Sequence, residues 1–130
     1  MGAPSKSWLT TGAVAALLAG CMAASPEEQL AAAKNSLQKN DSKAAIVQLK
    51  NVLQKEPQSL EARFLLGRGL LAESDFVGAL VEFEKVLEQG YPRAQVVPYL
   101  AQSLAGLRAY DKIIARFANE KIDDPRAQAA

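Results

Sequence analysis

The sequence predicts an all-α protein, an α-solenoid of about three helix–turn–helix repeats behind an N-terminal signal segment. The first observation is a spacing: Leu66 is followed 34 residues later by Leu100, and Phe83 is followed at the same distance by Phe117. A period of 34 residues is typical of a repeated helix–turn–helix unit. The second observation is the abundance of alanine and leucine, which favour helix. Because one such unit cannot bury its apolar face alone, about three units are needed for a stable core.

Residues 1–20 have the pattern of a signal peptide. Lys6 supplies a positive charge, and an uncharged, mostly apolar run of about a dozen residues extends from Trp8 to Ala19. A helix that spans a membrane needs roughly 20 apolar residues, so this run is typical of a signal-peptide core.

The segment Leu18-Ala19-Gly20-Cys21 resembles the bacterial lipoprotein signal, in which the cysteine is lipidated and becomes the mature N-terminus. The resemblance implies lipidation at Cys21, a short tether over residues 21–25, and a protein anchored in the bacterial cell envelope that faces the periplasm. An aspartate directly after the cysteine would favour retention in the inner membrane. Because Met22 stands at that position, the outer membrane is favoured. The alternatives are an ordinary secretory signal with a chance cysteine, or a buried N-terminal helix.

The first repeat is expected over residues 26–59. Ser25, Pro26 and Glu28 are the N-cap, first-turn proline and third-position glutamate of a capping box. Asn40 and Asp41 end this helix and cap the next one. The residues expected to face inward are Leu30, Ala33, Leu37, Ala45, Leu49, Val52 and Leu53.

The second repeat is expected over residues 60–93. Ser59 and Asp75 are placed to cap its two helices, and Gly90 is placed just past the second one, where a glycine ends many helices. The residues expected to face inward are Leu66, Gly67, Leu70, Ala79, Leu80, Phe83, Val86 and Leu87.

The third repeat is expected over residues 94–125. Because Pro98 is tolerated best in a first turn, we expect its first helix to begin near Gln95. Its second helix loses the apolar pattern at Glu120 and Lys121, where we expect fraying, and residues 126–130 resemble the start of a further repeat. The residues expected to face inward are Leu100, Ala101, Leu104, Tyr110, Ile113 and Phe117.

These residue types resemble the tetratricopeptide repeat (TPR). Small residues at Ala33, Gly67 and Ala101 allow two helices to approach closely, and large ones such as Phe76 and Tyr110 fill the space between repeats. The first repeat departs from the pattern, since Gln29, Ala32 and Ser36 stand where Trp, Leu and Tyr are usual.

A narrower resemblance is carried by residues 44–54, 61–67 and 87–92. They are similar to the N-terminus of the TPR lipoprotein family of the PEP-CTERM/exosortase sorting and exopolysaccharide system. The resemblance implies a scaffold that mediates protein–protein interactions in the envelope. The alternatives are an accessory subunit of a polysaccharide-synthesis enzyme complex, or a non-functional fragment of a longer TPR protein.

The composition of the chain gives no indication of catalysis or metal binding. The net charge is only +1, whereas binding of nucleic acid depends on many positive charges, so we expect no nucleic acid partner. The chain has no histidine and a single cysteine, so it lacks the commonest general base and the commonest metal ligand, and one thiol cannot hold a structural zinc ion. We therefore expect no enzyme activity, no cofactor, no metal and no small-molecule substrate. Glu82 and Lys85 are interpreted as solvated helix charges.

The TPR resemblance implies that protein partners bind in a concave groove lined by the first helix of each repeat. Lys34, Arg68 and Gln102 recur on these first helices at a spacing of 34 residues. Phe64 lies on the first helix of the second repeat. Lys34 and Arg68 would form an incomplete clamp for a peptide carboxylate, and the alternative is a solvated helix face. Phe64 is either an exposed aromatic anchor or part of the core.

Overall fold

The computed structural model describes residues 2–3 and 24–117, and within these residues it contains six helices and no strand. The helices are α1 (Pro26–Gln38), α2 (Ser42–Lys55), α3 (Leu60–Ala72), α4 (Phe76–Glu88), α5 (Arg93–Gly106) and α6 (Tyr110–Phe117). The fold is therefore all-α. Residues 4–23, which include most of the predicted signal peptide and Cys21, and the segments 118–125 and 126–130 lie outside the described residues.

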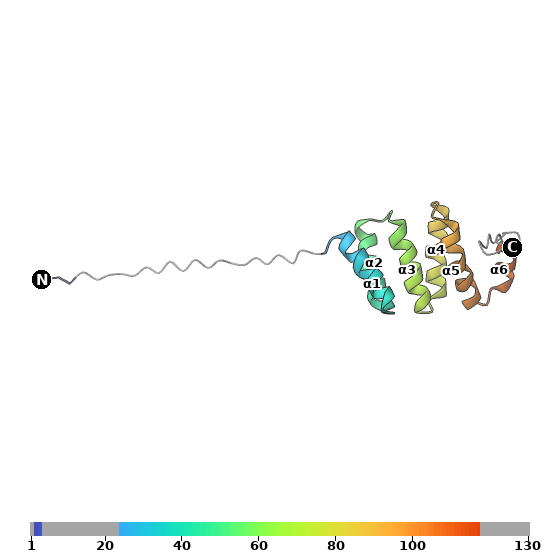
Figure 1. Cartoon of the computed structure of the whole chain (residues 1–130), viewed down its shortest axis with the longest axis horizontal. Coiled ribbons are helices and arrows are strands. Elements are labelled where there is room, and N and C mark those ends of the chain that lie inside the picture. The colour runs from blue at the N-terminus through green and yellow to red at the C-terminus, as the bar shows by residue number, and fades with distance from the viewer. Residues whose placement is uncertain (1, 4–23, 118–130) are drawn as a thin grey trace, which may run out of the picture.

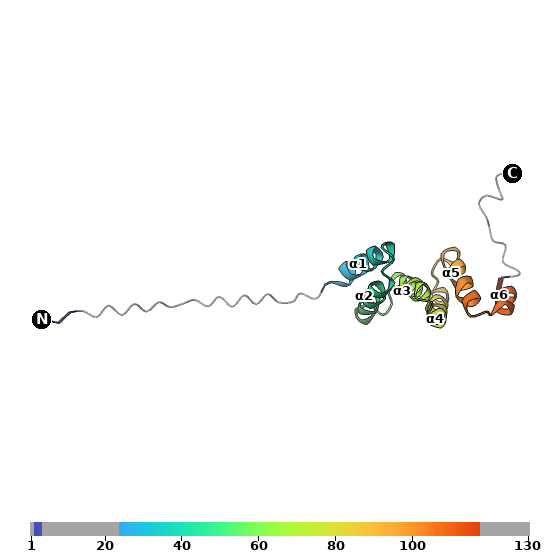
Figure 2. The same cartoon turned by 90° about the horizontal axis from the view of Figure 1, so that it is seen from below.

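The helices form a row in which each one packs against the next (Figure 1). The helix α3 also packs against both α1 and α5, whereas α2 and α4 are not in contact with each other. Figure 2 shows α3 set back between α1 and α5. The first helices of the three pairs therefore share one side of the row, and this is the side on which a groove was expected.

Side-chain caps start the first four helices where they were predicted. The hydroxyl of Ser25 accepts a hydrogen bond from the Glu28 N–H at 3.2 Å, and the Ser25 N–H donates to the Glu28 carboxylate at 2.8 Å, which completes the capping box. The side chains of Asp41, Ser59 and Asp75 cap α2, α3 and α4, and each accepts a hydrogen bond from the N–H three residues later.

The turns inside the pairs repeat the 34-residue period in the backbone itself. Asn40, Ser74 and Arg108 follow α1, α3 and α5, and their φ angles are 60°, 62° and 56°. In each turn the next N–H reaches back to a carbonyl five residues earlier, as in the bond from Asp75 to the Leu70 carbonyl at 2.9 Å. This is the Schellman ending, for which glycine is the favoured residue. Gly90 ends α4 with the same geometry at a φ of 85°.

The core lies along the contacts between successive helices. Its centre is Phe83, which is fully buried, and a Cβ placed on Gly67 would lie only 2.6 Å from the Phe83 ring. The absence of a side chain at Gly67 therefore allows α3 and α4 to approach. Other fully buried residues agree with the predicted inward faces: Ala33, Ala45, Leu49, Val52, Ala79, Val86 and Leu100.

Two predictions about the third repeat were wrong. The helix α5 begins at Arg93, not near Gln95, so Pro98 lies in its second turn. Val96 is buried in the core, while Pro98 itself is exposed, so the backbone hydrogen bond that it lacks faces solvent. Tyr110 does not fill a space between repeats, because it is 56% exposed and no described helix follows α6 to cover it. The side chain of Phe117 is not described.

The prediction that Glu82 is solvated was also wrong. Its side chain is 13% exposed and pairs with Arg63 of α3 at 2.9 Å, and Arg63 also donates to the Pro57 carbonyl. The Arg63 guanidinium therefore joins α3 to Glu82 of α4 and to the turn before α3.

Candidate functional site

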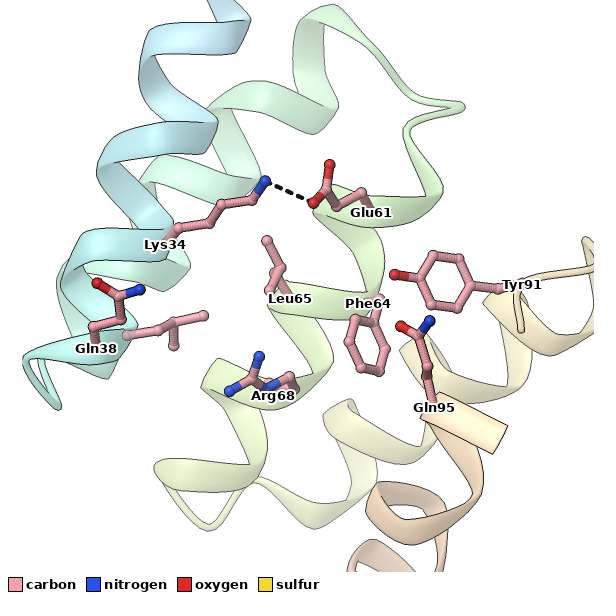
Figure 3. Close-up of a pocket in the computed structure, with 9 residues that line it drawn as sticks. Lys34, Gln38, Glu61, Phe64, Leu65, Arg68, Tyr91 and Gln95 are labelled. Atoms are coloured by element: carbon pink, nitrogen blue, oxygen red, sulfur yellow. Dashed lines mark ion pairs between the residues drawn. The ribbon is translucent and has the colours of Figure 1, made fainter. Parts of the chain in front are cut away.

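A pocket of about 390 Å³ opens between α1, α3 and the turn that joins α4 to α5 (Figure 3). It lies on the side of the row that the first helices share. The residues that line it are Lys34, Leu37, Gln38, Glu61, Phe64, Leu65, Arg68, Tyr91 and Gln95.

Aromatic rings form one wall of the pocket. Phe64 stacks on Tyr91 with ring centroids 5.0 Å apart and meets the edge of Tyr99 at 5.6 Å. The turn after Gly90 places Tyr91 there, because the Tyr91 N–H returns to the Val86 carbonyl at 2.9 Å. The hydroxyl of Tyr91 points into the pocket toward α3 (Figure 3). The wall therefore combines apolar ring faces with one hydroxyl.

The two cations of the pocket differ in their partners. Lys34 of α1 pairs with Glu61 of α3 at 2.7 Å, and since both side chains are about half exposed, this bridge contributes at most about 1 kcal/mol. The Arg68 guanidinium lies over the Tyr99 ring, 5.4 Å from its centroid. Among the described residues, Arg68 has no carboxylate partner. A guanidinium held in position by a ring but not neutralised is ready to accept an external anion.

The hydroxyl of Tyr91 is biased toward its neutral form. Burial raises the pKa of Tyr91, and the negative charge of Glu61 raises it further, while Lys34 and Arg68 act in the opposite direction. At neutral pH the hydroxyl is thus a hydrogen-bond donor beside two cations and one carboxylate.

The structure brings together three of the four residues predicted for the groove. Lys34, Phe64 and Arg68 line the pocket, but Gln102 does not. The helix α5 reaches the pocket with Gln95, near its start, and Gln102 lies about two turns further along on an exposed surface. Of the two alternatives for Phe64, the core is the one observed: it lines the pocket but is only 6% exposed, so it is not a free anchor.

Sequence reasoning missed several members of this site. Gly90 was predicted to end the second helix of its repeat, but the next residue, Tyr91, was not predicted to be carried into the pocket by that same turn. Glu61 gave no signal, because its role depends on the approach of α1 to α3. A tyrosine after a helix-ending glycine is the one local hint that was available.

Among the described residues, no three histidine, cysteine, aspartate or glutamate side chains gather in a way that could hold a metal ion. Within the same part of the chain, every helix is too short or too polar to cross a membrane. Comparison with protein-family models and with curated proteins found no match to this chain.

Proposed function

We propose that this chain is a TPR scaffold that binds protein partners through the pocket between α1 and α3. The observation that carries the proposal is the state of Arg68, which is oriented by Tyr99 and has no carboxylate partner among the described residues. Binding needs shape and complementary charge, and the pocket provides apolar surface beside a cation that has no carboxylate partner among the described residues.

The lining indicates the kind of segment that fits. Leu37 and Leu65 supply apolar surface, Gln38 and Gln95 supply amides, and Arg68 supplies the positive charge. A peptide that bears a carboxylate next to an apolar side chain would match the positive charge and the apolar surface, and its backbone groups could bind the amides. In a partly enclosed site, a guanidinium–carboxylate pair contributes orientation as well as affinity.

Charge reversal in the pocket tests this proposal. Envelope extracts are passed over the full-length protein, and bound proteins are compared for the wild type, Lys34→Glu and Arg68→Glu. The matched control is Lys43→Glu, which reverses an exposed lysine on α2, outside the pocket. We expect Arg68→Glu to reduce recovery of the specific partner at least about tenfold, a change of about 1.4 kcal/mol. Equal recovery by Arg68→Glu and Lys43→Glu would remove the pocket from the function.

We further propose that lipid at Cys21 holds the scaffold in the bacterial envelope, on the outer membrane and facing the periplasm. The lipoprotein-like segment before Cys21 supports this, and the resemblance to the PEP-CTERM/exosortase TPR lipoproteins suggests partners in protein sorting or exopolysaccharide export. Each buried methylene of an acyl chain contributes about 0.8 kcal/mol to membrane attachment. Labelling with a palmitate analogue should mark the wild type and not Cys21→Ser, and a label retained in the variant would contradict the anchor.

A further inference from the structure

The outer face of α2 carries positive charge around an exposed apolar side chain. Lys43, Val47 and Lys50 are spaced four and three residues apart, so they lie on one side of the helix, and Val47 is 60% exposed. The helix itself contains no aspartate or glutamate, and Asp41 and Glu56 only flank its two ends. Among the described residues, neither lysine of this face forms an ion pair. The face therefore combines two cations that are not neutralised with an apolar centre.

This charge is not a property of the repeat. One repeat length after Lys43, Val47 and Lys50, the residues of α4 are Val77, Val81 and Glu84. Two repeat lengths after the first lysine, α6 has an aspartate. Because valine and aspartate occupy the same position in the later pairs, the packing of the helices does not require a lysine there. The cations are confined to the helix pair at the N-terminal end of the row.

The chain enters the fold beside the C-terminal end of α2. The carbonyl of Ala24 accepts a hydrogen bond from the Gln29 Nε2 at 2.9 Å and another from the Lys55 Nζ at 3.1 Å. Cys21 precedes Ala24 by three residues, which span at most about 11 Å, so the lipid proposed above would hold this end of α2 close to the membrane surface. Residues 1–23 contain no aspartate or glutamate, so the segment before α1 has no carboxylate side chain for the lysines of α2.

We infer that the outer face of α2 binds the anionic headgroups of the membrane, with Lys43 and Lys50 on the phosphates and Val47 in the interface. Lysines close to a bilayer are attracted by the negative charge of its phospholipids. The proximity to the membrane rests on the proposed anchor, whereas the charge of α2 does not depend on it. Since α2 contributes no residue to the pocket, this contact leaves the pocket open to a protein partner.

Vesicle sedimentation tests the face without the anchor. The full-length protein with Cys21→Ser is mixed with vesicles that contain phosphatidylglycerol and, separately, with vesicles of phosphatidylcholine alone. The ratio of the two partition coefficients isolates the effect of lipid charge. Because each lysine near an anionic surface contributes about fivefold, we expect Lys43→Gln/Lys50→Gln to lower this ratio at least about tenfold. The matched control, Arg108→Gln/Lys112→Gln, removes the same charge from exposed residues near α6 and should keep the ratio of the wild type.

A probe on the lipidated protein tests the orientation. Cys21 is the only cysteine, and its thiol is consumed by the lipid, so Val47→Cys provides a single site for an environment-sensitive fluorophore. On phosphatidylglycerol vesicles that contain a lipid-bound quencher, we expect quenching at least about twofold greater than with Val81→Cys, the same register position on α4.

The outcomes separate this inference from the anchor. Loss of the palmitate label with the phosphatidylglycerol preference intact would contradict the anchor and support the α2 face. The inference is overturned by equal ratios for the wild type and Lys43→Gln/Lys50→Gln, or by equal quenching at the two probe positions. Binding of soluble polyglutamate through the same lysines, without a preference for phosphatidylglycerol, would also overturn it and would identify an acidic protein as the partner.

Discussion

Replacing Gly67 by alanine tests the packing between α3 and α4 through the sign of the change in the free energy of unfolding. Alanine is the better helix former, and propensity alone would stabilise the protein by about 1 kcal/mol. The structure predicts the opposite sign. The new Cβ would lie 2.6 Å from one Phe83 ring carbon and 3.0 Å from two others, whereas carbon atoms pack at about 3.5–4.0 Å.

The Phe83 ring has little room to move aside. It is fully buried, and the rings of Phe64 and Tyr99 lie 6.0 Å and 5.8 Å from it. Overpacking of a core costs about 1–3 kcal/mol, so after the gain in helix propensity we expect Gly67→Ala to lower the free energy of unfolding by about 1 kcal/mol.

Urea denaturation followed by far-ultraviolet circular dichroism measures the change. The double variant with Phe83→Leu completes a mutant cycle, in which the smaller side chain relieves the clash, so that the coupling energy is expected to be about 2 kcal/mol. A Gly67→Ala protein that is more stable than the wild type, or a cycle with no coupling, would refute the close packing of α3 on Phe83.

Three further predictions follow from single residues. Replacing Ser74 by glycine removes the strain of a left-handed residue, and we expect a gain of about 1 kcal/mol in thermal or urea unfolding. The raised pKa of Tyr91 means that its protonated form adds stability, complete below the unfolded pKa of about 10 and lost as pH rises through the folded pKa. An ultraviolet titration of the folded protein should show the raised pKa of Tyr91, and Glu61→Gln should lower that pKa. Arg63→Met leaves the Glu82 carboxylate without its closest partner, and we expect a loss of about 1–3 kcal/mol in urea unfolding; no loss would show that the pair is dispensable.

The helices and their starts were predictable because their causes are local. Asp41 and Asp75 cap helices through N–H groups three residues away, and a 34-residue period specifies which apolar residues face inward. The start of α5 was misjudged because Pro98 is accommodated in the second turn of the helix, where its side chain is exposed to solvent. The exposure of Tyr110 depends on what packs against α6, and no pattern inside α6 contains that information.

The pocket was predictable only in part. Lys34, Phe64 and Arg68 share a register position or a helix face, so their convergence follows from the repeat. Tyr91 enters from a turn, and its position depends on the left-handed Gly90 and the hydrogen bond to Val86. Contacts of this kind join segments that have different positions in the repeat, which a period cannot predict.

Site-specific photo-crosslinking in living cells tests the central claim most directly. A benzophenone amino acid replaces Gln38, an exposed residue on the rim of the pocket, or Val47, an exposed residue of α2 outside it. If the pocket binds a protein partner, the Gln38 probe yields one discrete adduct, Arg68→Glu removes that adduct, and the Val47 probe yields none. The same adduct from both probes, or no adduct from Gln38, would contradict the claim that this pocket is the partner site.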